Sequence, residues 1–542
     1  MILTFAFILC LYSIVVGYSY IFKLLLNDWK NNDEILIFNS DFIYGIFFLS
    51  LISIFFNFFI PLVKIIYPIS LLGFLIFIYI FLKKKLRINL LSLIMITSSL
   101  IFISHTNEVN YDSMLYHLQI IKHNTFFKSI FGVGHLEIRY GMNSTWHSLI
   151  SLFNISYGEF KVLYIFNILL YAFIINEVFS INLNKKNPSK LYLSISIAYI
   201  FIYSFFHPDR NGTFLENLGS PEVDTIVALL FIFAFYLFIS LYENKNTQTS
   251  QILILLCVLI VTIKLSHAAI LLLLFWFIIK ENIYKKYIKT FIVSSLFGVS
   301  WLFKGFIATG CFLFPFSFSC FNTSWSLSSK TVDHFKDIII SFNRTGPDRL
   351  RYNDFDHTIN SNDWILPWFK NYFLQTEFLY ISFLIIGLSV ILLLFLYIKN
   401  KVLILDKNYF FLLIVSLISL ILWFKAPEIR LGYGVIIGLV AITITILCMN
   451  INNNLFNPGL NKLIIIFPLL LVIYKNLNNI SFFNDSFTRN FDTTGFKLIQ
   501  NNDGVNIYRS NVPFCLDIID FCTFKTNKVF TIKNEKYIYF LN

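Results

Sequence analysis

The stretch from Pro221 to Ser240 reads PEVDTIVALLFIFAFYLFIS, two carboxylates followed by a long apolar run. An apolar helix of about 20 residues crosses the roughly 30 Å hydrocarbon core of a bilayer. Segments of this kind recur near 2–22, 42–60, 65–82, 88–104, 160–181, 191–206, 223–241, 290–308, 378–398, 408–424, 431–449 and 461–475. They predict an all-α polytopic membrane protein.

The composition supports this class of protein. Of 542 residues, 57% are hydrophobic and 13% are charged, and the mean hydropathy is +0.72. Soluble proteins carry about 25% charged residues. The net charge of +12 comes from lysines clustered between apolar segments, as in the flanks of membrane spans. Because no basic patch is interleaved with aromatic residues, we expect the lipid bilayer as a partner and no nucleic acid.

The apolar stretch 252–279 is too long for one ordinary span, and Lys264, Ser266 and His267 interrupt it. We interpret it as a hairpin of two short helices, with one tilted helix as the alternative. If the N-terminus is external and 252–279 is a hairpin, four lysine clusters all face the cytoplasm: 83–87, 185–190, 280–289 and 399–407. This arrangement satisfies the positive-inside rule. The first 22 residues lack a basic n-region and a cleavage site, which favours a retained helix.

This topology divides the chain into three parts. Residues 1–87 are N-terminal transmembrane helices, and residues 88–475 are a transmembrane core with external loops 105–159 and 309–377. The external segment 476–542 alternates polar and β-forming residues, which predicts a small α/β or β-rich appendage. Since about 65 residues make a small independent core, we expect it to pack on the membrane part.

Four cysteines fall in two external segments. Cys311 and Cys320 share one loop, and Cys515 and Cys522 share the C-terminal segment. We expect each pair to form a disulfide in an oxidising compartment. The alternative is that each cysteine is a small buried residue.

Residues 110–123, NYDSMLYHLQIIKH, follow an apolar segment and predict an amphipathic helix along the outer surface. Its polar face would carry Asp112, Tyr116, Gln119 and His123, opposite Met114, Leu118 and Ile121. Asp112 is a candidate catalytic carboxylate at the water–lipid boundary, or alternatively a helix N-cap. Tyr116 and His117 are candidate substrate-binding residues, or alternatively interfacial aromatic residues.

Further along the same loop, GHLEIRYGMNSTWHSLISLF (134–153) predicts a second interfacial helix from about Asn143 or Ser144. Arg139 precedes it. A lone external arginine suits bidentate binding of phosphate or carboxylate. The alternative is a structural ion pair with Glu137 or with Glu108, itself a candidate substrate-binding residue.

Other polar residues stand at predicted helix ends on the same side. Glu222 and Asp224 begin an apolar helix, where the alternative role is to interact with the helix dipole. Lys264 and His267 occupy the hairpin tip, with snorkelling of the lysine as the alternative. The turn FKAPEIRLGYG (424–434) adds Lys425 and Arg430, for which a Glu428–Arg430 surface pair is the alternative.

Five motifs carry a resemblance to known proteins: YDSMLYHLQIIK, RYGMNSTWHSL, IKLSHAA, TGCFLFP and KAPEIRLGYG. They resemble the GT-C class of integral-membrane glycosyltransferases, which includes protein mannosyltransferases and lipid A aminoarabinose transferases. They are most similar to a group of uncharacterised bacterial polytopic membrane proteins placed near that class. The resemblance spans most of residues 88–440 and implies a GT-C-like bundle of about 12–14 transmembrane helices.

The resemblance also implies a reaction. In the class, an acidic residue of the first external loop is the base, the donor is a sugar on a polyprenyl phosphate, and Asp112 is the matching position. The acceptor would be a cell-surface glycan, lipid or protein, at the external face of the bacterial inner (plasma) membrane. Many members have an Asp-Glu pair where this chain has Asp112-Ser113, which weakens a metal-dependent version, so we expect no cofactor, with a divalent metal as the unsupported alternative.

The chemistry needs a base for the acceptor proton and fixed positive charge for the departing phosphate. We therefore predict an external cavity bounded by 105–159, 264–267 and 425–430, where Glu108, Asp112, Arg139, Lys264 and Arg430 converge. One competing hypothesis is a transporter or flippase of lipid-linked sugars. Another is a non-catalytic component of polysaccharide assembly, which would not depend on Asp112.

Overall fold

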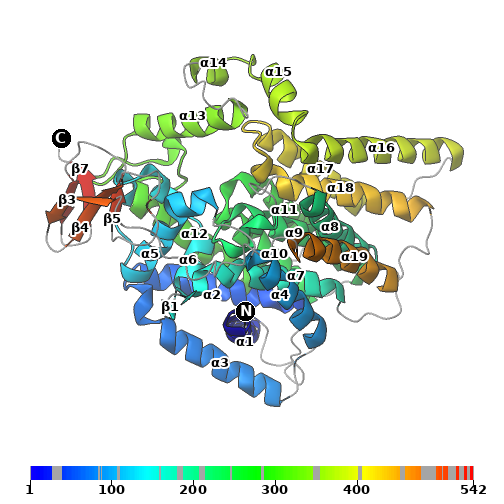
Figure 1. Cartoon of the computed structure of the whole chain (residues 1–542), viewed down its shortest axis with the longest axis horizontal. Coiled ribbons are helices and arrows are strands. Elements are labelled where there is room, and N and C mark those ends of the chain that lie inside the picture. Colours follow the sequence, from blue (N-terminus) through cyan, green and yellow to red (C-terminus); the bar gives the residue numbers. More distant parts are fainter. Residues whose placement is uncertain are drawn as a thin grey trace.

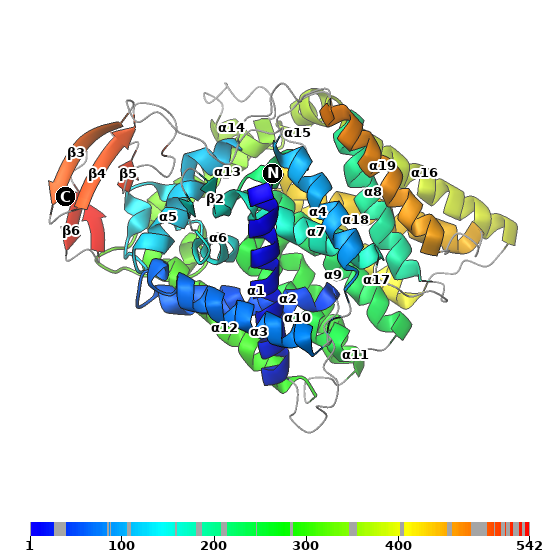
Figure 2. The same ribbon diagram turned by 60° about the horizontal axis from the view of Figure 1, so that its bottom comes forward.

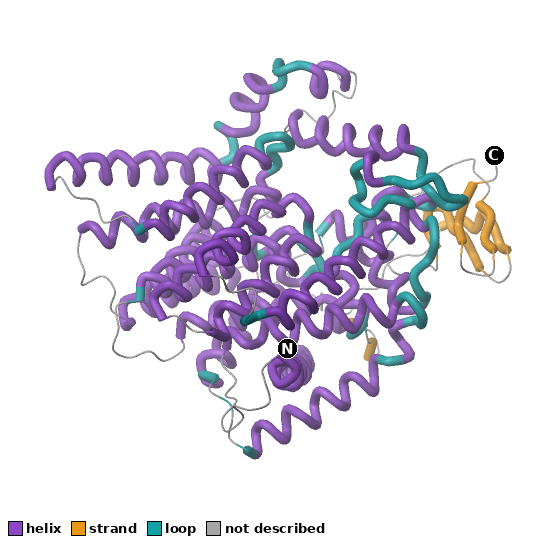
Figure 3. Tube along the Cα trace, turned by 180° about the vertical axis from the view of Figure 1, so that it is seen from behind, coloured by secondary structure: helices purple, strands orange, loops and turns teal. Residues whose placement is uncertain are grey.

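The computed structural model of the chain describes most of its residues. The described ranges are 2–26, 39–83, 86, 88–105, 110–154, 156–157, 160–179, 187–206, 214–244, 247–281, 286–345, 355–400, 406–451, 458–477, 496–502, 505–510, 515, 521–523, 530–533 and 537–540. Helices dominate these ranges (Figure 3).

Each predicted apolar segment is a helix in the structure. The long helices are α1 Ile2–Leu26, α2 Phe42–Asn57, α3 Ile66–Leu82, α4 Leu90–His105, α7 Phe166–Phe179, α8 Pro188–Phe206, α9 Asp224–Asn244, α10 Thr247–Ile263, α11 Leu272–Glu281, α12 Ile288–Thr309, α16 Glu377–Asn400, α17 Lys407–Trp423, α18 Ile429–Ile451 and α19 Pro458–Leu477. Among the described residues, 8 helices have the length and apolarity needed to cross a membrane. The chain is thus a helical protein of the membrane type.

The helices form a bundle with buried and exposed members (Figure 1). Helices α7 and α9 are almost entirely buried, whereas α12 and α16 expose most of their apolar surface. α9 packs on α8, α10 and α18, and α18 packs in turn on α16 and α17. Exposed apolar helix faces of this extent are typical of contact with lipid, because a soluble protein would cover them.

Hydrogen bonds between helix termini define two ends of the bundle. At one end Tyr44, near the start of α2, donates to Gln251 near the start of α10, and Ser189 at the start of α8 donates to Glu243 near the end of α9. At the other end Asn57 closes α2 and donates to the carbonyl groups of residues 124 and 127. We call these the lysine end and the loop end, since the first carries described lysines such as Lys190 and Lys407 and the second carries residues 110–154.

The stretch 252–279 reverses direction at Lys264, whose backbone is extended (φ −152°, ψ 114°). Beyond it, the ring of His267 in η9 (Leu265–Leu271) lies 5.7 Å from that of Phe231, near the start of α9. Trp276 then stacks at 4.4 Å on Phe411, near the start of α17 at the lysine end. The chain therefore returns toward the lysine end, as a hairpin requires.

The two predicted interfacial helices are helical, but their predicted surface position is wrong. The first combines a π-helical turn, η4 (Ser113–His117), with α5 (Leu118–Phe126). Gln119 on the expected polar face and Leu118 on the expected apolar face are both fully buried. The wide π turn takes about one extra residue, which shifts the 100° periodicity behind the prediction. The second helix, α6 (Thr145–Ser151), is buried throughout and packs on α2, α5 and α10.

Shorter elements complete the loop end and the connections. The helical ones are η2 Asn39–Asp41, η3 Leu62–Lys64, η5 Val133–His135, η6 Ile138–Gly141, η7 Val162–Ile165, η8 Glu216–Gly219, η10 Ser317–Ser319, α13 Ser329–Thr345, α14 Phe355–Asn360, α15 Ile365–Trp368 and η13 Phe369–Phe373. Strands β1 (Ser156–Tyr157) and β2 (Phe160–Lys161) form a small antiparallel pair. α12 ends at Gly310, whose φ of 81° is left-handed and favours glycine.

The described part of the C-terminal segment consists of strands, at one edge of the molecule (Figure 2). β3 (Phe496–Asn502) pairs antiparallel with β4 (Val505–Ser510), which pairs parallel with β5 (Phe521–Thr523); β6 (Phe530–Lys533) and β7 (Tyr537–Phe540) pair antiparallel. The segment docks on the loop end, because Thr523 donates to the carbonyl of Leu136 at 2.8 Å and Tyr140 donates to that of Cys522.

Both suggested cysteine pairs are joined in the structure, Cys311 to Cys320 and Cys515 to Cys522. The first closes the hairpin-like loop after α12, and the second ties residue 515 to strand β5. Among the described residues, the free cysteines are Cys10, Cys257 and Cys448, all on long apolar helices.

Candidate functional site

Asp112 stands at the start of the η4–α5 helix, but it does not cap that helix. The side chain of Asn110 accepts the hydrogen bond of the Asp112 backbone N–H at 2.8 Å. Asp112 itself has helical backbone angles (φ −64°, ψ −32°) and makes no side-chain cap bond. The capping interpretation of Asp112 is therefore wrong, because Asn110 fills that role and leaves the carboxylate available for other contacts.

The carboxylate of Asp112 meets an arginine that is distant in sequence. Nη1 of Arg430, in the first turn of α18, lies 2.7 Å from Oδ2 of Asp112. The same guanidinium lies 3.7 Å from Glu428 and 4.0 Å from Asp224. The two side chains of the close pair remain 25% and 23% exposed, so the pair is reachable from outside.

A second ion pair adjoins the first. Lys264, where the 252–279 hairpin reverses, pairs with Asp224 at the first position of α9. Glu222 caps that helix, since its carboxylate accepts from the N–H groups of Asp224 at 2.7 Å and Thr225 at 3.1 Å. Burial raises the pKa of the Glu222 carboxyl, although nearby Lys264 and Arg430 act in the opposite direction.

We call these six residues the acid cluster: Asp112, Glu222, Asp224, Lys264, Glu428 and Arg430. Four carboxylates face two cations, so the cluster has an excess of acid, and each cation already contacts a carboxylate. In the described part of the chain, no group of three or more His, Cys, Asp or Glu residues is arranged to hold a metal ion.

Two buried histidines lie behind Asp112. The rings of His117 and His147 are 4.5 Å apart. Nδ1 of His117 shares a hydrogen bond with the hydroxyl of Ser113 at 3.1 Å, and Nε2 of His147 donates to the carbonyl of Pro221 at 3.2 Å. Burial lowers the pKa of both imidazoles, that of His147 to about 3, so both rings are neutral at pH 7.

The Tyr116 ring packs edge-on against His117 at 4.3 Å, and burial followed by the Asp112 charge raises the pKa of its phenol. His147 and Ser113 also belong to this site, although they were not predicted from the sequence. Nothing in the local pattern distinguishes them, because both lie on helices whose other residues are also buried.

The structure brings together only part of the predicted constellation. Asp112, Lys264 and Arg430 converge, whereas Arg139 is paired at 3.0 Å with Glu137, the structural alternative, and remains 37% exposed. Glu108 lies outside the described residues.

Two further candidates form no ion pair with the acid cluster among the described residues. The side chain of Lys425 is exposed, and its carbonyl accepts from Arg344 at 3.0 Å. His267 is buried against Phe231 and its Nδ1 meets the hydroxyl of Ser266, so it is part of the hairpin packing.

Comparison with known proteins adds one assignment. No curated protein and no solved structure matches the chain. The sequence matches the family described as "Domain of unknown function (DUF8201)" over residues 1–437, a range that contains every residue of the acid cluster. The chain belongs to this family of domains of unknown function.

Proposed function

We propose that the protein is a membrane glycosyltransferase that moves a sugar from a polyprenyl-phosphate donor to a hydroxyl of a cell-surface glycan, lipid or protein. One observation carries the proposal. Asp112 is relieved of helix capping by Asn110, and its carboxylate is held at 2.7 Å by Arg430 from the far part of the chain. A carboxylate fixed in this way and still partly exposed suits a general base.

The proposed chemistry assigns a role to each part of the cluster. Asp112 accepts the proton of the acceptor hydroxyl as the new glycosidic bond forms and the bond between the anomeric carbon and the donor phosphate oxygen breaks, so that the polyprenyl phosphate departs as an anion. Arg430 positions that carboxylate, and Glu428 and Asp224 in turn lie within 4.0 Å of its guanidinium. The buried, neutral rings of His117 and His147 exclude water from one side of the site. The lower local dielectric strengthens the charge interactions beside them.

The proposed location is the external face of the bacterial plasma membrane. The acid cluster lies at the loop end of the bundle, with the disulfide-bonded segments, while described lysines of the predicted cytoplasmic clusters, such as Lys190 and Lys407, begin helices at the other end. Lysine-rich connections are typical of the cytoplasmic side. A transporter of lipid-linked sugars would also use cations in the membrane part to hold phosphate. Replacement of Asp112 separates a transporter from a transferase.

The test replaces Asp112 with Asn in the full chain, reconstituted in vesicles with polyprenyl-phosphate-linked sugars. Transfer to acceptor hydroxyls should fall by about 10² or more, the usual scale for loss of a general base. Expression and insertion should stay near normal, because Asn110 and not Asp112 caps the helix.

The matched control is Asp333→Asn, which changes a partly exposed acid on α13 and should leave transfer unchanged. Equal transfer by wild type and Asp112→Asn would remove the catalytic role. Movement of the labelled donor across the bilayer without any new glycosidic bond would favour a transporter.

A further inference from the structure

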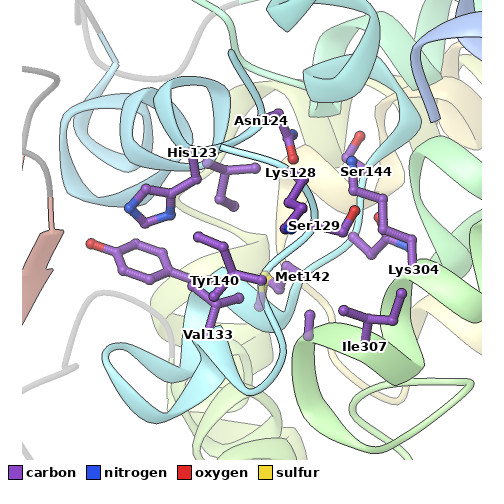
Figure 4. Close-up of a pocket in the computed structure, with 14 residues that line it drawn as sticks. His123, Asn124, Lys128, Ser129, Val133, Tyr140, Met142, Ser144, Lys304 and Ile307 are labelled. Carbon is purple, nitrogen blue, oxygen red and sulfur yellow. The ribbon is translucent and has the colours of Figure 1, made fainter. Parts of the chain in front are cut away.

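A pocket lies at the loop end, between α5, the segment that precedes α6, and α12 (Figure 4). It has a cavity volume of about 50 Å³, is partly open to solvent, and is bounded by α5, the segment 128–144 and the inner face of α12. Its apolar lining includes Ile120, Ile130, Val133, Met142, Ile307 and Ala308, and its polar lining includes Lys128, Ser144 and Lys304. None of these residues takes part in the proposed catalysis.

Lys304 is the unusual member of this lining. It is only 8% exposed, and its ammonium donates to the neutral hydroxyl of Ser148 at 2.8 Å. Within the described residues no carboxylate forms an ion pair with it. A buried ammonium without a countercharge is costly, so such a group either loses its proton or gains an anionic partner.

Lys304 does not point toward the exposed apolar side of α12. The outer face of α12 exposes Leu296, Val299 and Phe303, which gives this helix an apolar surface on one side. Lys304 lies on a different side of α12, toward α6 and the pocket (Figure 4). Its charge is therefore directed at the pocket.

A second buried polar group in the lining has no partner. The hydroxyl of Ser144 is buried, and no hydrogen bond satisfies it in the described part of the chain. The neighbouring polar groups are committed elsewhere, since Asn143 donates to the carbonyl of Trp301 and Ser129 donates to Asn57. Lys128 adds a further positive charge to the wall.

We propose that this pocket binds a phosphate group through Lys304, Ser144 and Lys128, with the apolar lining contacting a chain attached to it. Two ammonium groups and a hydroxyl donor match the charge and acceptors of a phosphate. The acid cluster cannot take this role equally well, because its cations face an excess of carboxylates. The site does not depend on Asp112 being a catalytic base.

The phosphate could belong to a lipid headgroup or be free in solution, and the experiment separates these sources. The full chain is purified in dodecyl maltoside, which contains no phosphate, and titrated with inorganic phosphate, with farnesyl phosphate and with farnesol. Dissociation constants come from calorimetry and thermal unfolding. Farnesyl phosphate should bind and farnesol should not.

Lys304→Met should weaken farnesyl phosphate binding at least about tenfold, the usual effect of losing a hydrogen bond to a charged group. Lys330→Met, which changes an exposed lysine on α13, is the matched control and should bind as wild type does. If Lys304→Met does not fold, Ser144→Ala and Lys128→Met carry the same test.

Tight binding of farnesyl phosphate with weak binding of inorganic phosphate identifies a lipid headgroup, and equal binding of both identifies free phosphate. Absence of binding by both, or equal affinity in wild type and all three pocket variants, would overturn the site. Asp112→Asn should keep this affinity. Failure of the pocket is therefore distinguishable from failure of the proposed catalysis.

Discussion

The acid cluster and the phosphate pocket each contain a cation that a membrane-type helix carries at the loop end, but the two cations have different surroundings. Arg430, on α18, contacts Asp112 and lies near Glu428 and Asp224. Lys304, on α12, contacts the hydroxyl of Ser148. The first charge is compensated within the chain, and the second has no compensating charge among the described residues.

This difference indicates which of the two cations can bind an anion that comes from outside the chain. A guanidinium already shared by carboxylates gains little from a phosphate, because the phosphate must displace or repel those carboxylates. An uncompensated ammonium in a low-dielectric pocket gains most from an incoming negative charge. The presence of a cation does not by itself predict where an anion binds, because the carboxylates around that cation also matter.

The largest expected difference between the two cations is the change in stability when each is replaced by Met. Arg430→Met leaves partly buried carboxylates uncompensated and should lower the free energy of unfolding by about 2–3 kcal/mol, less than for a fully buried pair. Lys304→Met removes an uncompensated charge and should leave stability equal or higher in the absence of phosphate. Thermal and denaturant unfolding in detergent measure both. Destabilisation of similar size in the two variants would contradict the distinction.

A smaller effect is expected from His147, which should make the stability of the protein depend on pH. Because His147 has a pKa of about 3 when folded and an ordinary value when unfolded, the unfolded chain binds its proton first as pH falls. Its contribution to stability should be complete above about pH 6.5 and decrease below it by about 1.4 kcal/mol per pH unit.

The measurement is unfolding stability between neutral and acidic pH for wild type and His147→Gln, whose amide can still donate to Pro221. The variant should show a flatter profile. His334→Gln, at an exposed position on α13, should retain the wild-type slope. Identical slopes for wild type and His147→Gln would mean that this imidazole is not held neutral by burial.

The smallest effect is expected at Arg139. This residue lies outside both sites, and its exposed side chain pairs with Glu137. Arg139→Ala should change stability by about 0–1 kcal/mol, the range for surface ion pairs. Sugar transfer and phosphate affinity should stay near the wild-type values in the assays above. A large loss of transfer in this variant would return Arg139 to the list of substrate-binding residues.

The sequence determined the helices and their order. Long apolar runs such as 223–241 leave few alternatives to a helix, because hydrophobic length and backbone hydrogen bonding act locally. Lys264 likewise marked the reversal within 252–279, since an intramembrane charge interrupts a continuous span. Asp112, Lys264 and Arg430 were recognisable for the same reason, as rare charges at apolar helix ends.

Their partners were decided by the tertiary structure. Whether Asp112 caps its helix depends on Asn110, and whether it meets Arg430 depends on contacts across 318 positions of sequence. The burial of the two loop helices was also beyond the local pattern, because the π turn alters the periodicity and Gln119 meets the distant Cys515. Charges and periodicity are properties of neighbouring residues, whereas countercharges and burial are supplied by residues that only the folded chain brings together.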